Sequence, residues 1–295
     1  MGDTSLLIRL VPALFVLIWS TGWIAARAAA PYCDPLTFLT IRYALATLAL
    51  SAFAMAVGAR WPKTREEFGH AMFSGVLLHA IYLGGVWWAI SHGVPTGISG
   101  VIAAVQPILT ALLAPRLARE TITAKQWLGI ALGFFGIAMV LQPKLAVVDV
   151  GQLGTVALPL AVNVVGMIAV TLGTFYQKRF IATGDLRTTT MLQYVGAAIV
   201  TLPLAYALEP MRMTWNLPVV VTMAWSVLGL SIGAIGLLLF LIRRGAVSRA
   251  AALVYLVPPA VALEAMLLFG ETLGPLQIAG MAVTAAGVAL AVRKS

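Results

Sequence analysis

The chain has 295 residues, of which 61 % are hydrophobic and only 10 % are charged, and its mean hydropathy is +0.98. Soluble domains carry about 25 % charged residues, so this composition excludes a soluble monomer and indicates an integral membrane protein. The net charge of +9 would suggest a nucleic-acid partner in a soluble protein, but none is expected here. The only cysteine, Cys33, excludes an internal disulfide and a thiolate metal cluster.

Apolar runs of membrane-spanning length follow one another along the chain. A transmembrane helix needs about 20 mostly apolar residues, whereas strands of a transmembrane barrel alternate apolar and polar residues. The continuous runs predict an all-α fold whose surrounding partner is the lipid bilayer. Ten transmembrane helices are expected, at residues 10–29, 36–58, 68–90, 95–115, 124–141, 154–177, 188–207, 217–241, 246–268 and 275–292.

Basic residues gather in alternate connections between these helices. Cytoplasmic loops retain Lys and Arg, so this asymmetry predicts that both termini are cytoplasmic. The cytoplasmic set is Arg9, Arg60, Lys63, Arg65, Arg116, Arg119, Lys125, Lys178, Arg179, Arg187, Arg243, Arg244, Arg249, Arg293 and Lys294, against Arg27, Lys144 and Arg212 outside. Cys33 then lies in the first outer connection, where we expect it to react with thiol reagents.

The second half of the chain repeats the first at a constant offset of 151 residues. Pro107, Glu120, Gln126, Gly129 and Gly136 recur as Pro258, Glu271, Gln277, Gly280 and Gly287. Five helices is an odd number, so the second unit enters the membrane inverted. We expect two inverted five-helix repeats, at residues 1–145 and 146–295. Inverted repeats are typical of secondary transporters, in which the substrate binds near the midplane between the repeats.

Some repeated residues have local structural explanations. Thr123 and Gln126 form the pattern of a capping box at the start of the helix at 124–141. Glu120 and Glu271 precede helix starts, where a carboxylate complements the positive end of the helix. Gly129 and Gly136 are expected to allow close helix packing.

The repeated pattern occurs together with ten predicted helices, the segment Trp19-Ser20-Thr21-Gly22 and the basic residue Arg42. In these features the chain resembles the EamA family of the drug/metabolite transporter superfamily. The resemblance covers essentially the whole chain. It implies a central cavity and export of small metabolites across a bacterial inner membrane. Among bacterial members, the chain is most similar to aromatic amino acid exporters. The repeat has diverged where Gln193 matches Arg42 and where Leu113 matches Glu264.

Polar side chains within the bilayer are costly and usually face a cavity or a partner. His79 lies at the centre of the helix at 68–90, and Tyr82 follows it on the same face; the alternative is a neutral histidine bonded between helices. The tryptophans have core packing as their alternative role. The candidate substrate-binding residues are His79, Tyr82, Trp19, Trp23, Gln106, Tyr255 and Asn163.

Four further residues are candidates for gating or structural roles. Pro107 and Pro258 lie within predicted helices, where proline frees backbone carbonyls. We expect the helices at 95–115 and 246–268 to be broken there, although a kink that only shapes packing is the alternative. Arg42 and Glu264 are interpreted as gating or structural residues rather than direct ligands, and Glu264 as able to pair with a basic group.

The function expected is export of small metabolites by alternating access, with amino acids, and aromatic ones in particular, favoured as substrates. Only Glu264 and His79 offer candidate proton carriers, which favours a facilitative mechanism over a proton-coupled one. The alternative is a proton-coupled exporter of drugs, other metabolites or lipid-linked sugars. An enzyme is not expected, because no catalytic constellation is present. No cofactor or metal is expected, and the oligomeric state expected is a monomer or weak homodimer.

Overall fold

The computed structural model describes residues 3–244 and 251–292, and within them every regular element is helical. The ten predicted transmembrane helices are confirmed by length and composition; the predicted start at 246 lies outside the described residues. The candidate membrane spans are Leu10–Ala29, Pro35–Ala56, Arg65–Ser91, Thr96–Leu117, Ala124–Ala146, Leu153–Phe180, Leu186–Leu208, Leu217–Leu238, Ala251–Leu268 and Pro275–Val292.

Six spans consist mainly of one α-helix. These helices are α1 (Asp3–Ala29), α2 (Pro35–Ala56), α7 (Ala124–Ala146), α8 (Ala157–Phe180), α9 (Leu186–Leu208) and α14 (Pro275–Val292). A 3-10 segment, η2 (Val150–Val156), leads into α8.

The other four spans are composite. The third and eighth spans contain π-helical segments, and the fourth and ninth are broken just before a proline. The third span is α3 (Arg65–Gly75), η1 (Val76–Gly84) and α4 (Gly85–Ser91), and the fourth is α5 (Thr96–Ala104) and α6 (Gln106–Leu117). The eighth is α10 (Leu217–Trp225), η3 (Ser226–Ala234) and α11 (Ile235–Arg244), and the ninth includes the 3-10 turn η4 (Val254–Leu256) and α13 (Val257–Phe269).

The breaks predicted at Pro107 and Pro258 are confirmed. Pro107 occupies the first turn of α6, directly after the interruption at Val105. Pro258 occupies the first turn of α13, directly after η4. Proline is tolerated at these positions because the first turn of a helix leaves its N–H groups unbonded in any case.

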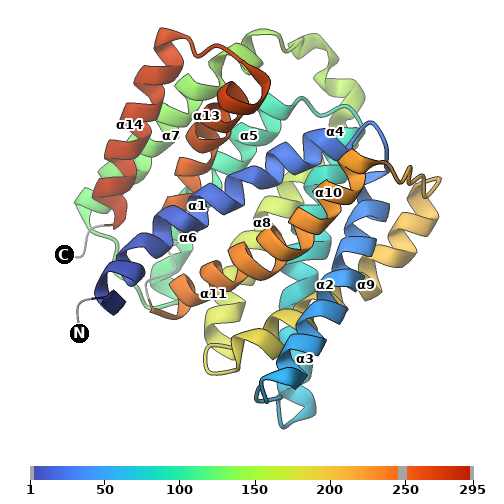
Figure 1. Ribbon diagram of the computed structural model, residues 1–295. Helices are drawn as coiled ribbons and strands as arrows, with labels where there is room; N and C mark the ends of the chain where they lie inside the picture. The colour runs from blue at the N-terminus through green and yellow to red at the C-terminus, as the bar shows by residue number, and fades with distance from the viewer. Residues whose placement is uncertain (1–2, 245–250, 293–295) are drawn as a thin grey trace.

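Two helix pairs pack closely on either side of the molecule (Figure 1). α7 and α14 lie side by side, and α2 packs against α9. At the first contact, a Cβ on Gly136 would collide with Thr284, and one on Gly129 would collide with the backbone of Gly287. The predicted small-residue face is therefore confirmed: these glycines let the two backbones approach each other.

The predicted capping box is confirmed at α7. The hydroxyl of Thr123 accepts a hydrogen bond from the Gln126 N–H, and the Thr123 N–H donates to Gln126 Oε1. Glu120 and Glu271 have partners that the sequence did not predict. Each forms an ion pair with a basic residue, Glu120 with Lys178 at 3.2 Å and Glu271 with Arg27 at 2.6 Å.

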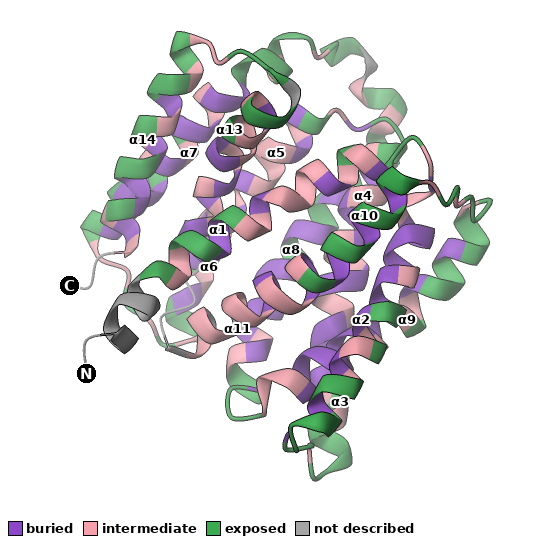
Figure 2. Cartoon of the chain, viewed as in Figure 1, coloured by how far each residue is buried: buried purple, intermediate pink, exposed green. Residues whose placement is uncertain are grey.

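The outward faces of the helices are exposed and the sides that face one another are buried (Figure 2), and many of the exposed residues are large and apolar. Leu48, Phe135 and Leu267 are each more than half exposed. This distribution suits a protein whose outer surface contacts lipid, because apolar side chains that face hydrocarbon avoid the cost of exposure to water. Cys33 departs from its expected exposure. It is buried, and its thiol donates to the Ala29 carbonyl oxygen, with a single bridge to Met213 alongside.

Candidate functional site

Two hollows with a shared wall lie between the helices, with empty spaces of about 640 and 620 Å³ that include the part open to solvent. Trp19 of α1, Leu78, His79 and Tyr82 of η1, and Ile235 of α11 line both of them, so we treat them as one central hollow. The enclosed space within them is only about 40 and 70 Å³. Sites for small molecules usually have volumes of about 300–1,000 Å³, so the hollow is nearly closed in this conformation and has to widen to admit a metabolite.

The π-helical segment η1 brings His79 and Tyr82 to this hollow. π-Helical turns are rare and occur frequently at functional sites. The His79 ring stacks on Tyr194 with ring centres 4.7 Å apart, and it is almost fully buried. Its Nε2 atom has no hydrogen-bond partner among the described residues. A buried polar atom without a partner calls for an explanation, and a bound ligand would provide one.

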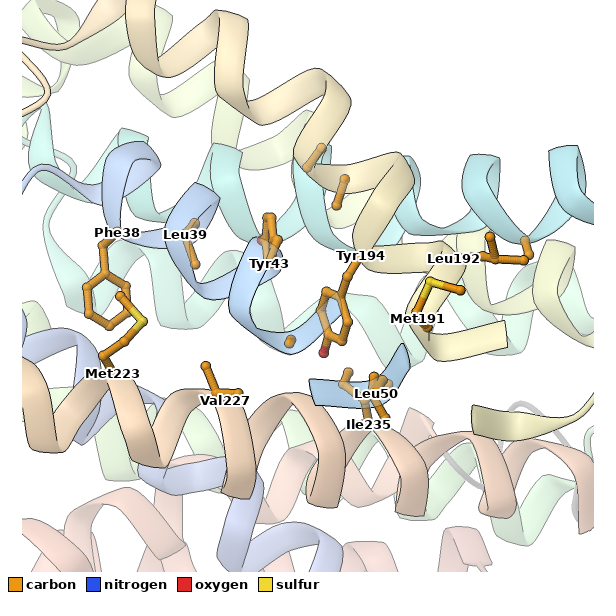
Figure 3. Close-up of a cluster of buried hydrophobic side chains, with 14 of the residues drawn as sticks. Phe38, Leu39, Tyr43, Leu50, Met191, Leu192, Tyr194, Met223, Val227 and Ile235 are labelled. Carbon is orange, nitrogen blue, oxygen red and sulfur yellow. The ribbon is translucent and has the colours of Figure 1, made fainter. Parts of the chain in front are cut away.

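Two stacked tyrosines support the π-helical segments from one side. Tyr43 of α2 and Tyr194 of α9 lie 5.5 Å apart between ring centres (Figure 3). The Tyr43 hydroxyl donates to the backbone oxygen of His79, and the Tyr194 hydroxyl donates to that of Ser231, each at 3.0 Å. Both acceptors belong to π-helical segments, η1 and η3. The tyrosines therefore fix the backbone beside the hollow.

Amide side chains contribute further polar groups. Gln193 of α9 donates to the Ser74 hydroxyl at 3.0 Å and to Gln177 Oε1 at 3.4 Å, while its own Oε1 is buried without a partner. Gln177, Gln193 and Gln106 all line the hollow. The remaining walls are mainly apolar and aromatic, with Phe15 beside Trp19 at 5.3 Å between ring centres.

The structure brings five of the seven candidate substrate-binding residues to the hollow. Its walls include His79, Tyr82, Trp19, Trp23 and Gln106.

Tyr255 and Asn163 do not line the hollow. Tyr255 is fully buried against Gly133 of α7, and its hydroxyl has no partner among the described residues. Asn163 donates to the Ser99 hydroxyl at 2.7 Å, between α8 and α5.

The two charged candidates also have defined surroundings. Glu264 accepts a hydrogen bond of 2.5 Å from Ser20, so the partner it has is a hydroxyl rather than the basic group expected. Arg42 lines the hollow, and its Nε donates to the Ser231 hydroxyl at 2.9 Å.

Gln177, Gln193 and Thr174 also line the hollow and were missed by the sequence analysis. Gln193 could have been found, because it is the repeat counterpart of Arg42 and lies within an apolar span. Gln177 precedes Lys178, so the sequence placed it at the end of a membrane-spanning helix and not among the polar residues at membrane depth.

Comparison with known proteins identifies the family. The model of the EamA-like transporter family matches residues 7–142 and, a second time, residues 158–293. The chain belongs to this family. It is thus a membrane transporter, and its helices and relatives make it a multi-pass inner membrane protein.

Several curated relatives match over nearly the full chain. The uncharacterized inner membrane transporter YedA of Escherichia coli K12 is 27 % identical over 96 % of this chain and 90 % of its own. The uncharacterized transporter YvbV of Bacillus subtilis is 23 % identical, covering 97 % and 92 %. A probable terminal-alkyne amino-acid exporter of Streptantibioticus cattleyicolor is 28 % identical, covering 96 % and 92 %. A solved crystal structure with 17 % identity shares the fold, with a TM-score of 0.79 over 96 % of both chains.

Proposed function

We propose that this EamA-family transporter exports amino acids, with aromatic side chains favoured, by facilitative alternating access. The observation that carries the proposal is the composition of the central hollow. It combines polar groups from His79, Tyr82 and Gln193 with the indole rings of Trp19 and Trp23. An aromatic amino acid needs hydrogen-bonding groups for its zwitterionic end and an apolar, aromatic wall for its ring.

A relative adds support for the substrate class. The Streptantibioticus protein, named as a probable exporter of a terminal-alkyne amino acid, aligns with this chain over almost its whole length. Its name specifies an amino acid but mentions no aromatic ring, so the preference for aromatic side chains rests on the hollow alone.

The inverted five-helix repeats at 1–145 and 146–295 remain part of the proposal, and paired contacts support them. The two ion pairs correspond at the repeat offset, since Arg27 matches Lys178 and Glu271 matches Glu120. Two long hydrogen bonds between α7 and α14 correspond in the same way. Gln126 donates to the oxygen of Ala291 and Gln277 to that of Val140, each at 3.4 Å. The two matches to the family model begin and end at the same offset.

The contacts between helices also correspond between the two halves of the chain. The first span packs on the eighth (α1 on η3) and the sixth packs on the third (α8 on η1), as two equivalent contacts. The first also packs on the ninth (α1 on α13), and the sixth on the fourth (α8 on α6). Two units related in this way can exchange conformations, which is the basis of alternating access in transporters with inverted repeats.

Proteoliposomes loaded with radiolabelled L-tryptophan test the proposal. We expect efflux well above that from protein-free vesicles, saturation with substrate, and trans-stimulation by unlabelled tryptophan. Absence of flux for tryptophan, phenylalanine and tyrosine, with flux of another solute in the same vesicles, would refute export of aromatic amino acids. An imposed pH gradient should not drive accumulation; accumulation against the gradient would refute the facilitative mechanism.

A further inference from the structure

Arg42 is a buried cation at the wall of the hollow. It lies on α2, its residue is 5 % exposed, and it lines the hollow together with Trp23 and Trp87. Removing a charged group from water is costly unless a partner compensates it. Charged side chains at membrane depth therefore usually pair with another group or face a water-filled path.

The protein partners of Arg42 are neutral. Its Nε donates to the Ser231 hydroxyl at 2.9 Å, and its guanidinium also interacts with the Tyr194 hydroxyl. Across residues 3–244 and 251–292, the ion pairs formed by carboxylates involve other bases, and none includes Arg42. Glu264, which the sequence offers as the intramembrane acid, is bonded to Ser20 instead. The hollow thus carries a positive charge that no carboxylate of the described chain balances.

We propose that Arg42 binds the carboxylate of the transported molecule, so that the hollow selects organic carboxylates and rejects cations that lack one. A guanidinium presents a planar fork of donors that matches a carboxylate, and such charge-assisted bonds are among the strongest hydrogen bonds. The Ser231 bond to Nε orients the group, and the terminal N–H groups that do not contact Tyr194 can donate to other acceptors. This inference rests on the proposed function, because it takes the hollow as the substrate site.

The rest of the hollow agrees with a carboxylate at one end. Gln193 occupies the repeat position that corresponds to Arg42, so the pair of sites carries one cation instead of two. Gln193 Oε1 and His79 Nε2 are both without partners among the described residues, and each can accept a hydrogen bond from an ammonium group. The hollow is therefore asymmetric, with a charged end for a carboxylate and neutral acceptors for an amine.

Ligand-induced stabilisation of the purified, full-length protein in detergent tests this inference. The probes are 3-phenylpropionate and L-phenylalanine, which carry a carboxylate, and phenethylamine and L-phenylalaninamide, which lack one. At a probe concentration about tenfold above Kd, we expect the carboxylates to raise the Tm of the wild type by about 2–4 °C. The two probes without a carboxylate should leave the Tm unchanged.

Variants locate the effect. Arg42→Gln should abolish the response to both carboxylates, and Arg42→Lys should retain a reduced response, because lysine keeps the charge but loses the fork. Arg65→Gln is the matched control, since Arg65 is exposed at the start of α3, and it should respond like the wild type. A normal response in Arg42→Gln would overturn the inference. Equal stabilisation of the wild type by phenethylamine, or no response to any carboxylate, would overturn it even if Arg42→Gln fails to fold.

The outcome is separable from that of the proposed function. Carboxylate binding that depends on Arg42, without flux of any amino acid in proteoliposomes, would refute amino-acid export and leave the inference standing. Export of phenylalanine by Arg42→Gln at the wild-type rate would refute the inference and leave export standing.

Discussion

At the scale of single residues, His79 and Tyr82 are the side chains on which transport should depend most. Both lie on η1 at the wall of the hollow, and Nε2 of the His79 ring has no hydrogen-bond partner among the described residues. We expect His79→Ala or Tyr82→Ala to lower the rate of tryptophan efflux from proteoliposomes at least about tenfold, which corresponds to about 1.4 kcal/mol.

Tyr206→Ala is the control, because Tyr206 lies on α9 and is 80 % exposed. It should transport like the wild type. Since His79 also stacks on Tyr194, the Tm of each variant must be measured alongside. Loss of transport that is accompanied by an equal loss of folded protein would contradict a role in substrate binding.

Cys33 should resist thiol reagents. Burial, with a further contribution from the neighbouring Asp34 carboxylate, raises the pKa of the Cys33 thiol to about 11. A raised pKa means that less thiolate is present at any given pH below it. At pH 8, alkylation by iodoacetamide should be about a hundredfold slower than in the denatured chain, and it should accelerate as the pH rises toward 11. Rapid labelling of the native protein at pH 8 would contradict the buried position.

At the scale of elements, the contact between α7 and α14 makes a direct prediction about stability. A Cβ on Gly136 would meet both the Thr284 side chain and the backbone of Gly280. Backbone cannot yield as a flexible side chain can, so Gly136→Ala should destabilise the protein by about 1–3 kcal/mol, as overpacking generally does.

Gly69→Ala is the matched substitution, since a Cβ there on α3 meets no atom within 4 Å. Alanine favours helix over glycine by about 1 kcal/mol, so this variant should be unchanged or slightly stabilised. Thermal unfolding in one detergent measures both. Equal Tm values for the two variants would mean that α7 and α14 do not pack as closely as described.

The elements that were predictable from the sequence are those defined by composition or by a single local rule. Continuous apolar runs predicted the ten spans, and prolines predicted the breaks before α6 and α13. The π-helical segments η1 and η3 follow no local rule. They depend on support from Tyr43 and Tyr194, which lie on other helices.

The same distinction, between local and long-range determinants, separates the site residues that the sequence could predict from those that it could not. Polar residues in the middle of apolar runs, such as His79, could be identified as candidates from their expected depth in the membrane alone. The orientation of a side chain around its helix could not, and this is why Tyr255 and Asn163 were included although they do not line the hollow. The sequence indicated only a gating or structural role for Arg42. Its contacts with Ser231 and Tyr194 could not be predicted, because these residues lie on η3 and α9, both more than 140 residues away in the sequence.

At the scale of the whole molecule, orientation in the membrane remains a prediction that labelling can test. In a Cys33→Ser background, a cysteine at Thr64 should react with an impermeant maleimide only from the cytoplasmic side. A cysteine at Asp149 should react only from the outside. Both positions lie in connections between described spans, after α2 and after α7. Labelling of the two positions from the same side would contradict the proposed orientation.

The two corresponding ion pairs are placed to control alternating access. In the proposed orientation, Lys178–Glu120 lies on the cytoplasmic side and Arg27–Glu271 on the outer side. Each pair joins helices of different repeats, so each should stabilise closure on its own side. Neutralising one pair should therefore shift the population toward opening on that side, by about twofold to fivefold for pairs near the surface.

A cysteine replacing Thr174, which lines the hollow, reports the shift in a Cys33→Ser background. Its labelling rate by an impermeant methanethiosulfonate is measured separately from each side of oriented vesicles. Glu120→Gln should raise the rate from the cytoplasmic side, and Glu271→Gln should raise it from the outer side. Because the two residues are repeat counterparts, the variants should act in opposite directions on the ratio of the two rates. A shift of that ratio in the same direction by both variants would contradict closure by paired gates.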